Sequence, residues 1–211
     1  RGIHSLPSRS ALAARGLSTT SSSLLRKDED MQVEAIIDDA IEKKYPEPVV
    51  IVLAKEKNGK VNPITLRCCM FTSFMPPRVV ISMGKNWHSL EVILKAKEFV
   101  LSFPSELQAE SALLFGTKSG KYMDKLAASG IRTLPAKRIN CLLIEDAVAN
   151  FECRLTDKLR TGDHVILVGE IIAAHVNPEA PGRLYTIDED FNLSGIRVKN
   201  KSGKKPVRDA K

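Results

Sequence analysis

The chain has 211 residues, of which 43% are apolar, so it is long enough to bury one full hydrophobic core. Its net charge of +7 comes from the ends: residues 1–27 hold five Lys or Arg and no acid, and residues 196–211 hold seven with one acid. This distribution argues against a nucleic-acid partner, which needs a basic face on folded structure, and no apolar run reaches the ~18–20 residues of a membrane span.

The two basic ends are expected to lie outside the folded domain. Residues 1–30 are rich in Ser, Arg, Ala and Leu, a composition typical of a mitochondrial transit segment. The alternative is an upstream extension, with Met31 as the natural start. We therefore expect a cytoplasmic location, or the mitochondrial matrix if the segment is a targeting signal. Residues 196–211 are expected to form a basic disordered tail, which leaves 31–195 as a single domain.

The sequence of the first half of this domain predicts two helices and four strands. Apolar residues at helical spacing indicate a short amphipathic helix over 35–44. The pair Asn58-Gly59 predicts a hairpin between the strands on either side, and Met75-Pro76-Pro77 predicts a turn. The predicted strands are 49–54, 61–71, 78–83 and 98–103, and a second helix is predicted over 90–97.

The second half predicts two more helices and a long hairpin. The helices cover 105–115 and 123–129, and Gly130 ends the latter. The strands cover 147–157 and 164–176, with a turn around Gly162. Strands that do not alternate with helices predict a mainly β fold with short helices, a β-barrel in form, rather than a doubly wound parallel sheet. There is no G-x-G-x-x-G motif.

The four cysteines predict no metal site. They are Cys68, Cys69, Cys141 and Cys153, and no two have the Cys-x-x-Cys spacing. We expect small buried thiols in a reducing compartment.

Polar residues inside the predicted strand 61–71 are the first candidates for a binding site. Asn62 and Thr65 interrupt an apolar pattern, and a buried amide or hydroxyl is costly unless it is paired. A ligand with many polar atoms would supply partners, and the fork of Arg67 matches two phosphate oxygens. The alternative is that these residues face solvent on the outer side of the barrel.

Three further candidates follow along the chain. Ser89 stands where an N-cap belongs, and with Lys85 beside the helix start it would form a phosphate seat; the alternative is an ordinary capped loop. The basic loop 116–121 lacks P-loop spacing, so we expect no nucleoside triphosphate there. His164 opens a buried strand, and its alternative is a purely structural role.

Taken together and in their order along the chain, the motifs resemble those of the flavin reductase-like domain family, and of its flavoredoxin-like branch, over about residues 31–176. The matching pieces are Asn62-x-x-Thr65, Ser73 with Pro76-Pro77, Ser89-x-Glu91-x-Ile93, Glu98-Phe99-Val100, Ser119-Gly120-Lys121 with Asp124-Lys125, Leu134-Pro135-Ala136, Phe151-Glu152-Cys153, and Gly162-Asp163-His164 with Val168-Gly169-Glu170. The chain departs from many relatives at Arg67-Cys68, where they carry Ser-Trp.

The resemblance implies an FMN-binding split β-barrel that forms a homodimer, with FMN near the interface. It implies that the cofactor is bound by Asn62, Thr65, the backbone from Arg67 through Cys68 and Cys69, Ser89, Lys125 and His164, to which the phosphate seat adds Lys85. His164 is the residue expected to act on the reacting part of the cofactor.

The function implied is that of a flavin reductase, an oxidoreductase that reduces bound FMN with NAD(P)H. The electrons would pass to free flavin, a metal complex or a redox partner protein. Two alternatives stay open: a flavoredoxin-like electron carrier with little NAD(P)H oxidation, and a non-catalytic binding protein. The sequence indicates neither the electron donor nor the final acceptor.

Overall fold

The computed structural model describes residues 32–188 and 190–196. Contacts between residues divide the chain into a unit of residues 1–36 and a unit of residues 37–211. The described part of the first unit, residues 32–36, contains no helix or strand. The expected extension 1–30 and the expected tail beyond residue 196 lie outside the described residues.

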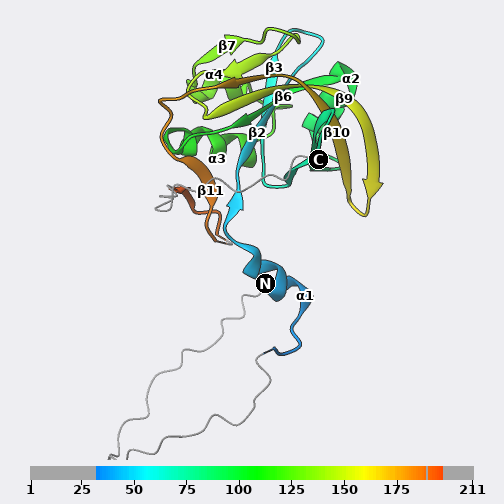
Figure 1. Cartoon of the computed structure of the whole chain (residues 1–211), viewed down its shortest axis with the longest axis vertical. Coiled ribbons are helices and arrows are strands. Elements are labelled where there is room, and N and C mark those ends of the chain that lie inside the picture. Colours follow the sequence, from blue (N-terminus) through cyan, green and yellow to red (C-terminus); the bar gives the residue numbers. More distant parts are fainter. Residues whose placement is uncertain (1–31, 189, 197–211) are drawn as a thin grey trace, which may run out of the picture. The chain divides into compact units, whose positions relative to one another are not determined.

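The second unit is built on one antiparallel sheet of seven strands in the order β3-β2-β6-β9-β10-β5-β4 (Figure 1). The mainly β prediction is confirmed. The strands of this sheet are β2 (Val50–Lys55), β3 (Val61–Leu66), β4 (Cys69–Phe74), β5 (Pro77–Gly84), β6 (Glu98–Phe103), β9 (Ala149–Thr161) and β10 (His164–Val176).

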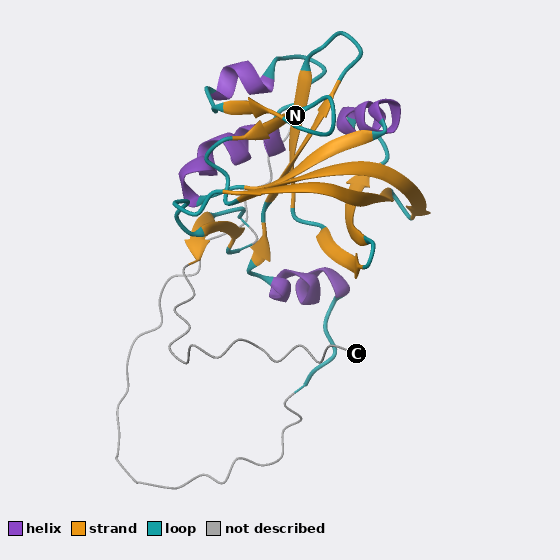
Figure 2. Cartoon of the chain, turned by 45° about the horizontal axis from the view of Figure 1, so that its top comes forward, coloured by secondary structure: helices purple, strands orange, loops and turns teal. Residues whose placement is uncertain are grey.

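Short helices and two small sheets complete this unit (Figure 2). The helices are α1 (Ile37–Ile41), η1 (Glu42–Lys44), α2 (His88–Ala96), η2 (Glu106–Gln108), α3 (Ala109–Thr117) and α4 (Lys125–Ser129). The small sheets pair β7 (Thr133–Pro135) with β8 (Leu142–Ile144), and join β1 (Glu47–Pro48), β11 (Arg183–Thr186) and β12 (Leu193–Ile196).

The two edges of the large sheet are joined by a two-residue connection. β3 ends at Leu66 and β4 begins at Cys69, yet they occupy opposite ends of the strand order. The chain therefore passes directly from one edge strand of the sheet to the other, which is the connectivity expected of a split barrel, and no ladder pairs β3 with β4 among the described residues. The prediction of one strand over 61–71 is wrong because the chain turns here: the Cys69 amide donates to the Arg67 carbonyl (3.0 Å).

The hydrophobic core explains why the strand at 49–54 reads as a continuous apolar run. Val50, Val52 and Ala54 pack into the core cluster that includes Phe99. Val49, Ile51 and Leu53 pack on the opposite face of the sheet, into a second cluster. Because β2 is buried on both faces, no position along it needs to be polar.

Several local predictions are confirmed, and two are wrong in addition to the single strand over 61–71. The predicted strands 98–103 and 164–176 match β6 and β10, and the hairpin, the second helix and the Gly130 helix end are present. Ser89 is not an N-cap: Trp87 takes that position, and Ser89 lies inside α2. Not every thiol is buried, since Cys68 is exposed and Cys69 half-buried. In the part of the chain that the structure describes, no helix has the length and apolar character to cross a bilayer.

Candidate functional site

A cavity of about 1070 Å³ opens between β3, the start of α2 and the segment that joins α3 to α4. This is at the upper end of the range for small-molecule sites, roughly 300–1,000 Å³. Apolar side chains from β3, from α2 and the residue before it, and from the end of α3 line it, together with a large number of polar groups. The apolar lining residues are Ile64, Trp87, Leu90, Leu94 and Phe115.

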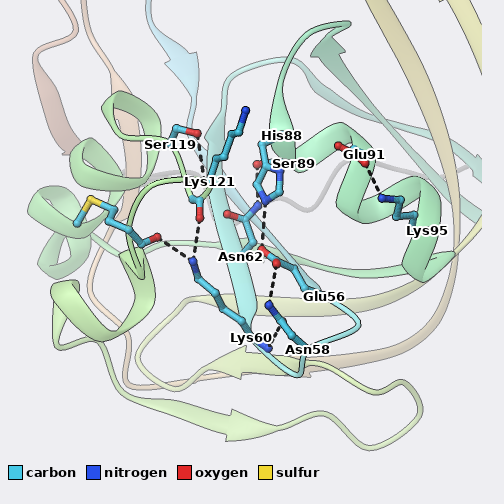
Figure 3. Close-up of polar contacts among 12 residues, drawn as sticks. Glu56, Asn58, Lys60, Asn62, His88, Ser89, Glu91, Lys95, Ser119 and Lys121 are labelled. Atoms are coloured by element: carbon cyan, nitrogen blue, oxygen red, sulfur yellow. Dashed lines mark hydrogen bonds and ion pairs between the residues drawn. The ribbon is translucent and has the colours of Figure 1, made fainter.

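The wall of this cavity contains a buried polar pair. The Asn62 side-chain amide donates to Ser89 Oγ at 2.8 Å, and Asn62 is only 2% exposed (Figure 3). Its Oδ1 atom is buried without a hydrogen-bond partner. Gly120 lies so close that an added Cβ would be 1.8 Å from Oδ1. A buried unpaired acceptor costs free energy, and the close contact with Gly120 covers this atom, so Asn62 acts on the cavity through its hydrogen bond to Ser89.

Lys125 brings a buried positive charge to the same cavity. It is 2% exposed, and its Nζ donates to the Phe115 carbonyl at 3.0 Å. Burial, and to a lesser extent the charge of Lys60, lowers the pKa of Lys125 to about 8. An anion bound nearby would offset both effects, because it would favour the charged form of the amine.

The other charges around the cavity are also mostly positive. Among the described residues that line it, five are lysines and one is a glutamate. That glutamate, Glu91, is already paired with Lys95 at 2.5 Å. The lysines are Lys85, Lys95, Lys118, Lys121 and Lys125. The cavity is therefore suited to a ligand that carries negative charge.

The hairpin before β3 braces both sides of the cavity (Figure 3). Lys60 Nζ donates to the carbonyls of Gly120 (2.8 Å) and Met123 (2.9 Å), and these two hydrogen bonds hold the loop before α4 in place. Glu56 Oε1 lies 3.2 Å from His88 Nε2, at the start of α2. These contacts fix the two walls relative to the same hairpin.

The structure brings together five of the nine residues expected to bind the cofactor. Thr65, Lys85, Ser89 and Lys125 line the cavity, and Asn62 lies behind Ser89. Thr65 is itself engaged, since its hydroxyl donates to the Ala112 carbonyl at 2.6 Å.

The other four expected residues are not among those that line the cavity: Arg67, Cys68, Cys69 and His164. Arg67 is held by the segment before β2, since its Nη1 donates to Tyr45 Oη at 2.5 Å and lies 3.3 Å from Glu47 Oε2. Burial raises the pKa of the Cys69 thiol to about 11. His164 packs its ring against Trp87, with the ring centroids 5.7 Å apart.

Some lining residues were not expected to be part of the site. Trp87 is not among the residues that the sequence pattern singles out, and the basic loop 116–121 lacks the P-loop spacing that would mark a nucleotide site. The loop 116–121 nevertheless forms one wall of the cavity. Its glycines and lysines were the sequence signal that could have identified it as part of a binding site. Among the described residues, no three His, Cys, Asp or Glu side chains gather closely enough to hold a metal ion.

These features fit a flavin nucleotide. The excess of lysines suits a phosphate, and the apolar lining residues suit a flat aromatic system. No single feature is specific, but together they describe a ligand with an aromatic part and an anionic part.

The fold and the site define a flavin-binding protein, and the chain belongs to the flavin reductase-like domain family. The family's sequence model, described as "Flavin reductase like domain", matches residues 42–193, which is more than half of the chain. The resemblance noted in the sequence is thereby confirmed.

Individual relatives share this fold at low sequence identity. An uncharacterized protein of Pyrococcus abyssi is 33% identical over 108 residues, which are 51% of this chain and 62% of that protein, so the chain spans less than two thirds of its length. The crystal structure of flavoredoxin from Methanosarcina acetivorans is similar with a TM-score of 0.67 and 24% identity, covering 77% of this chain and 91% of that one. The NADH:FAD oxidoreductase of Streptomyces globisporus matches with a TM-score of 0.68 and 20% identity, over 79% and 99% of the two chains.

Proposed function

We propose that this protein is an FMN-binding oxidoreductase that takes electrons from NAD(P)H and passes them to free flavin, a metal complex or a partner protein. The observation that carries the proposal is the cavity between β3, α2 and the loop before α4, with its excess of lysines and its apolar and aromatic lining. The description of the Streptomyces globisporus relative as an NADH:FAD oxidoreductase supports a pyridine nucleotide as the donor.

The residues of the cavity would bind and orient the cofactor. Lys125 and the lysines of the loop before α4, Lys118 and Lys121, would neutralise the phosphate, while Asn62 would hold the Ser89 side chain in the wall of the cavity. When bound, FMN would supply the redox chemistry. The part of the protein is binding, orientation and a positive electrostatic environment.

We also propose that two copies of the chain form a homodimer. β4 lies at the edge of the sheet, and its Met70 side chain is 60% exposed, with Phe71 and the turn residue Met75 exposed beside it. An exposed apolar edge strand favours association unless it is covered. A dimer mass in sedimentation equilibrium, reduced to a monomer by Met70→Glu, is the expected result; a wild-type monomer at micromolar concentration contradicts it.

The test of the function is an absorbance titration of the purified protein with FMN, followed by anaerobic addition of NADH or NADPH. Flavin bands that shift on binding and bleach within seconds are the expected result. Bands that shift but do not bleach contradict the reductase and favour the electron carrier. If FMN does not bind at all, the chain retains the family fold without the family's cofactor.

A control separates the proposed phosphate contacts from a general effect of charge. Lys121→Met should weaken FMN binding, because Lys121 lines the cavity. Lys137→Met removes an exposed lysine that does not line it and should leave binding unchanged. Equal effects of the two substitutions would show that the net charge alone attracts FMN.

A further inference from the structure

Trp87 is the one tryptophan of the chain, and it lines the cavity. It is the residue immediately before α2, with extended backbone, and 44% of it is exposed. Packing among the described residues therefore leaves a large part of this indole uncovered. A large aromatic side chain gains most when both of its faces are covered, so the open side of Trp87 is a place where a second flat group would bind favourably.

The ring is nevertheless held firmly by the protein. Gly84 lies directly beneath it, since a Cβ added there would be 2.7 Å from Trp87 Cε2 and 2.8 Å from Nε1. His164 packs edge-to-face against it, at 75° between the ring planes. His164 is in turn held by Asp163, whose Oδ1 lies 2.7 Å from Nδ1. Because the ring is braced from two sides, it needs little reorganisation to accept a ligand.

We propose that Trp87 forms the aromatic wall of the cavity and packs against the flat ring system of the bound flavin, and that His164 acts through Trp87 as a positioning residue. The inference rests on the proposed function, since it requires that the cavity bind a flavin. The lysine-rich loop before α4 lines the same cavity, so the site offers an aromatic surface and an anion-binding surface to one ligand.

Another aromatic residue of the cavity, Tyr122, is a weaker candidate for this role. It is 81% exposed, and its ring is contacted by the ammonium group of Lys121 at 5.5 Å. Among the described residues, no aromatic ring packs against Tyr122 and no glycine lies against its ring as Gly84 does beneath Trp87. Tyr122 therefore serves as the matched control, because it lines the same cavity without the bracing that distinguishes Trp87.

The experiment measures FMN affinity from the absorbance shift and the emission of bound FMN, because an indole in contact with a flavin quenches its fluorescence by electron transfer. Trp87→Ala should weaken FMN binding by about tenfold, the size expected for stacking one flat ring, and should restore the emission of bound FMN severalfold. Trp87→Phe keeps a ring that is a poor electron donor, so it should restore emission with a smaller loss of affinity. Tyr122→Ala should leave bound FMN as dim as in the wild type.

The outcomes separate this inference from the proposed function. If the wild type binds FMN but both Trp87 variants leave affinity and emission unchanged, or if Tyr122→Ala is the variant that restores emission, Trp87 is not the wall and the proposed function stands. If the wild type causes no FMN absorbance shift, both fail. Trp87→Phe decides the question should Trp87→Ala not fold, which far-ultraviolet circular dichroism reports.

The positioning role of His164 has its own readout. His164→Ala should change the emission maximum of Trp87 in the absence of FMN, since the two rings are in contact. The His164→Ala substitution should weaken FMN binding when Trp87 is present but not when it is combined with Trp87→Ala, because a residue that acts through another has no effect once that residue is gone. An equal loss in both backgrounds would mean that His164 contacts FMN directly.

Discussion

Replacing Lys125 by methionine should make the protein more stable and a poorer FMN binder. The ammonium group is buried, and its pKa of about 8 lies well below the ordinary lysine value of 10.5. Burial is the main cause and the charge of Lys60 the second. Each pKa unit corresponds to about 1.4 kcal/mol, so holding this charge in the folded protein costs at most about 3.5 kcal/mol at pH 7. Methionine has a similar length and no charge.

Part of this gain is lost, because methionine cannot donate to the Phe115 carbonyl as Lys125 Nζ does. An intramolecular hydrogen bond contributes about 1 kcal/mol, so the net stabilisation should be about 2 kcal/mol. Urea unfolding at pH 7 without FMN measures it. The unfolded chain holds the lysine proton more tightly than the folded protein, so the cost of the charge is complete below pH 8 and shrinks as the pH rises towards 10.5. The advantage of Lys125→Met should therefore narrow over that range.

The same substitution should weaken FMN binding tenfold or more, by removing a charge from the proposed phosphate site. Riboflavin, which has no phosphate, should bind both proteins with similar affinity and is the matched control. The reasoning is refuted if Lys125→Met is less stable than the wild type at pH 7 with no change in the difference up to pH 10. In that case the amine would be stabilising the fold, and its burial would not indicate a site for an anion.

Two further predictions concern the buried carboxylate of Glu152 and the close contact at Gly120. Glu152 is fully buried and accepts hydrogen bonds from the backbone amides of residues 137–139 and from His175, so Glu152→Gln should lower the free energy of unfolding by about 2–4 kcal/mol. Burial raises the pKa of Glu152 but these donors outweigh it and hold the pKa below the usual range, so the difference should shrink as the pH falls below ~4.3, as acid unfolding would show. Gly120→Ala places a Cβ against Asn62 Oδ1 and should weaken FMN binding at least tenfold, whereas Gly59→Ala, in an open hairpin turn, should cost stability alone; equal FMN affinity in both would contradict the close contact.

The sequence predicted most of the large sheet, because the signals there are local. The conformation of an apolar run such as β10, or of a turn such as Asn58-Gly59, can be predicted from the residues of that segment alone. The break at Arg67 is different, since its cause is that β3 pairs with β2 while β4 pairs with β5. Strand pairing over that distance leaves no mark in the apolar pattern. The short strands β7, β8, β11 and β12 were missed for a different reason, since three or four residues carry too little pattern to be recognised.

The site was predicted where polar residues stood in an apolar pattern, and missed where partners came from elsewhere in the chain. Asn62 and Ser89 were both identified, but the hydrogen bond between them joins positions 27 residues apart, and only the fold could show that Ser89 serves Asn62 and not the helix start. Arg67 shows the opposite case. Its guanidinium matches a phosphate in principle, but Tyr45 and Glu47 already occupy it, and neither is near it in sequence.

This contrast suggests where the cofactor chemistry of the chain is determined. The residues that line the cavity and still have unused capacity are Lys125, with its buried charge, and Trp87, with an uncovered face, while Asn62 behind them keeps a buried acceptor. Residues whose polar groups are already paired within the protein, such as Arg67, have little to offer a ligand. Unsatisfied groups that converge on one cavity are thus stronger evidence for a binding site than residue type alone, because the protein bears their cost in the absence of the ligand.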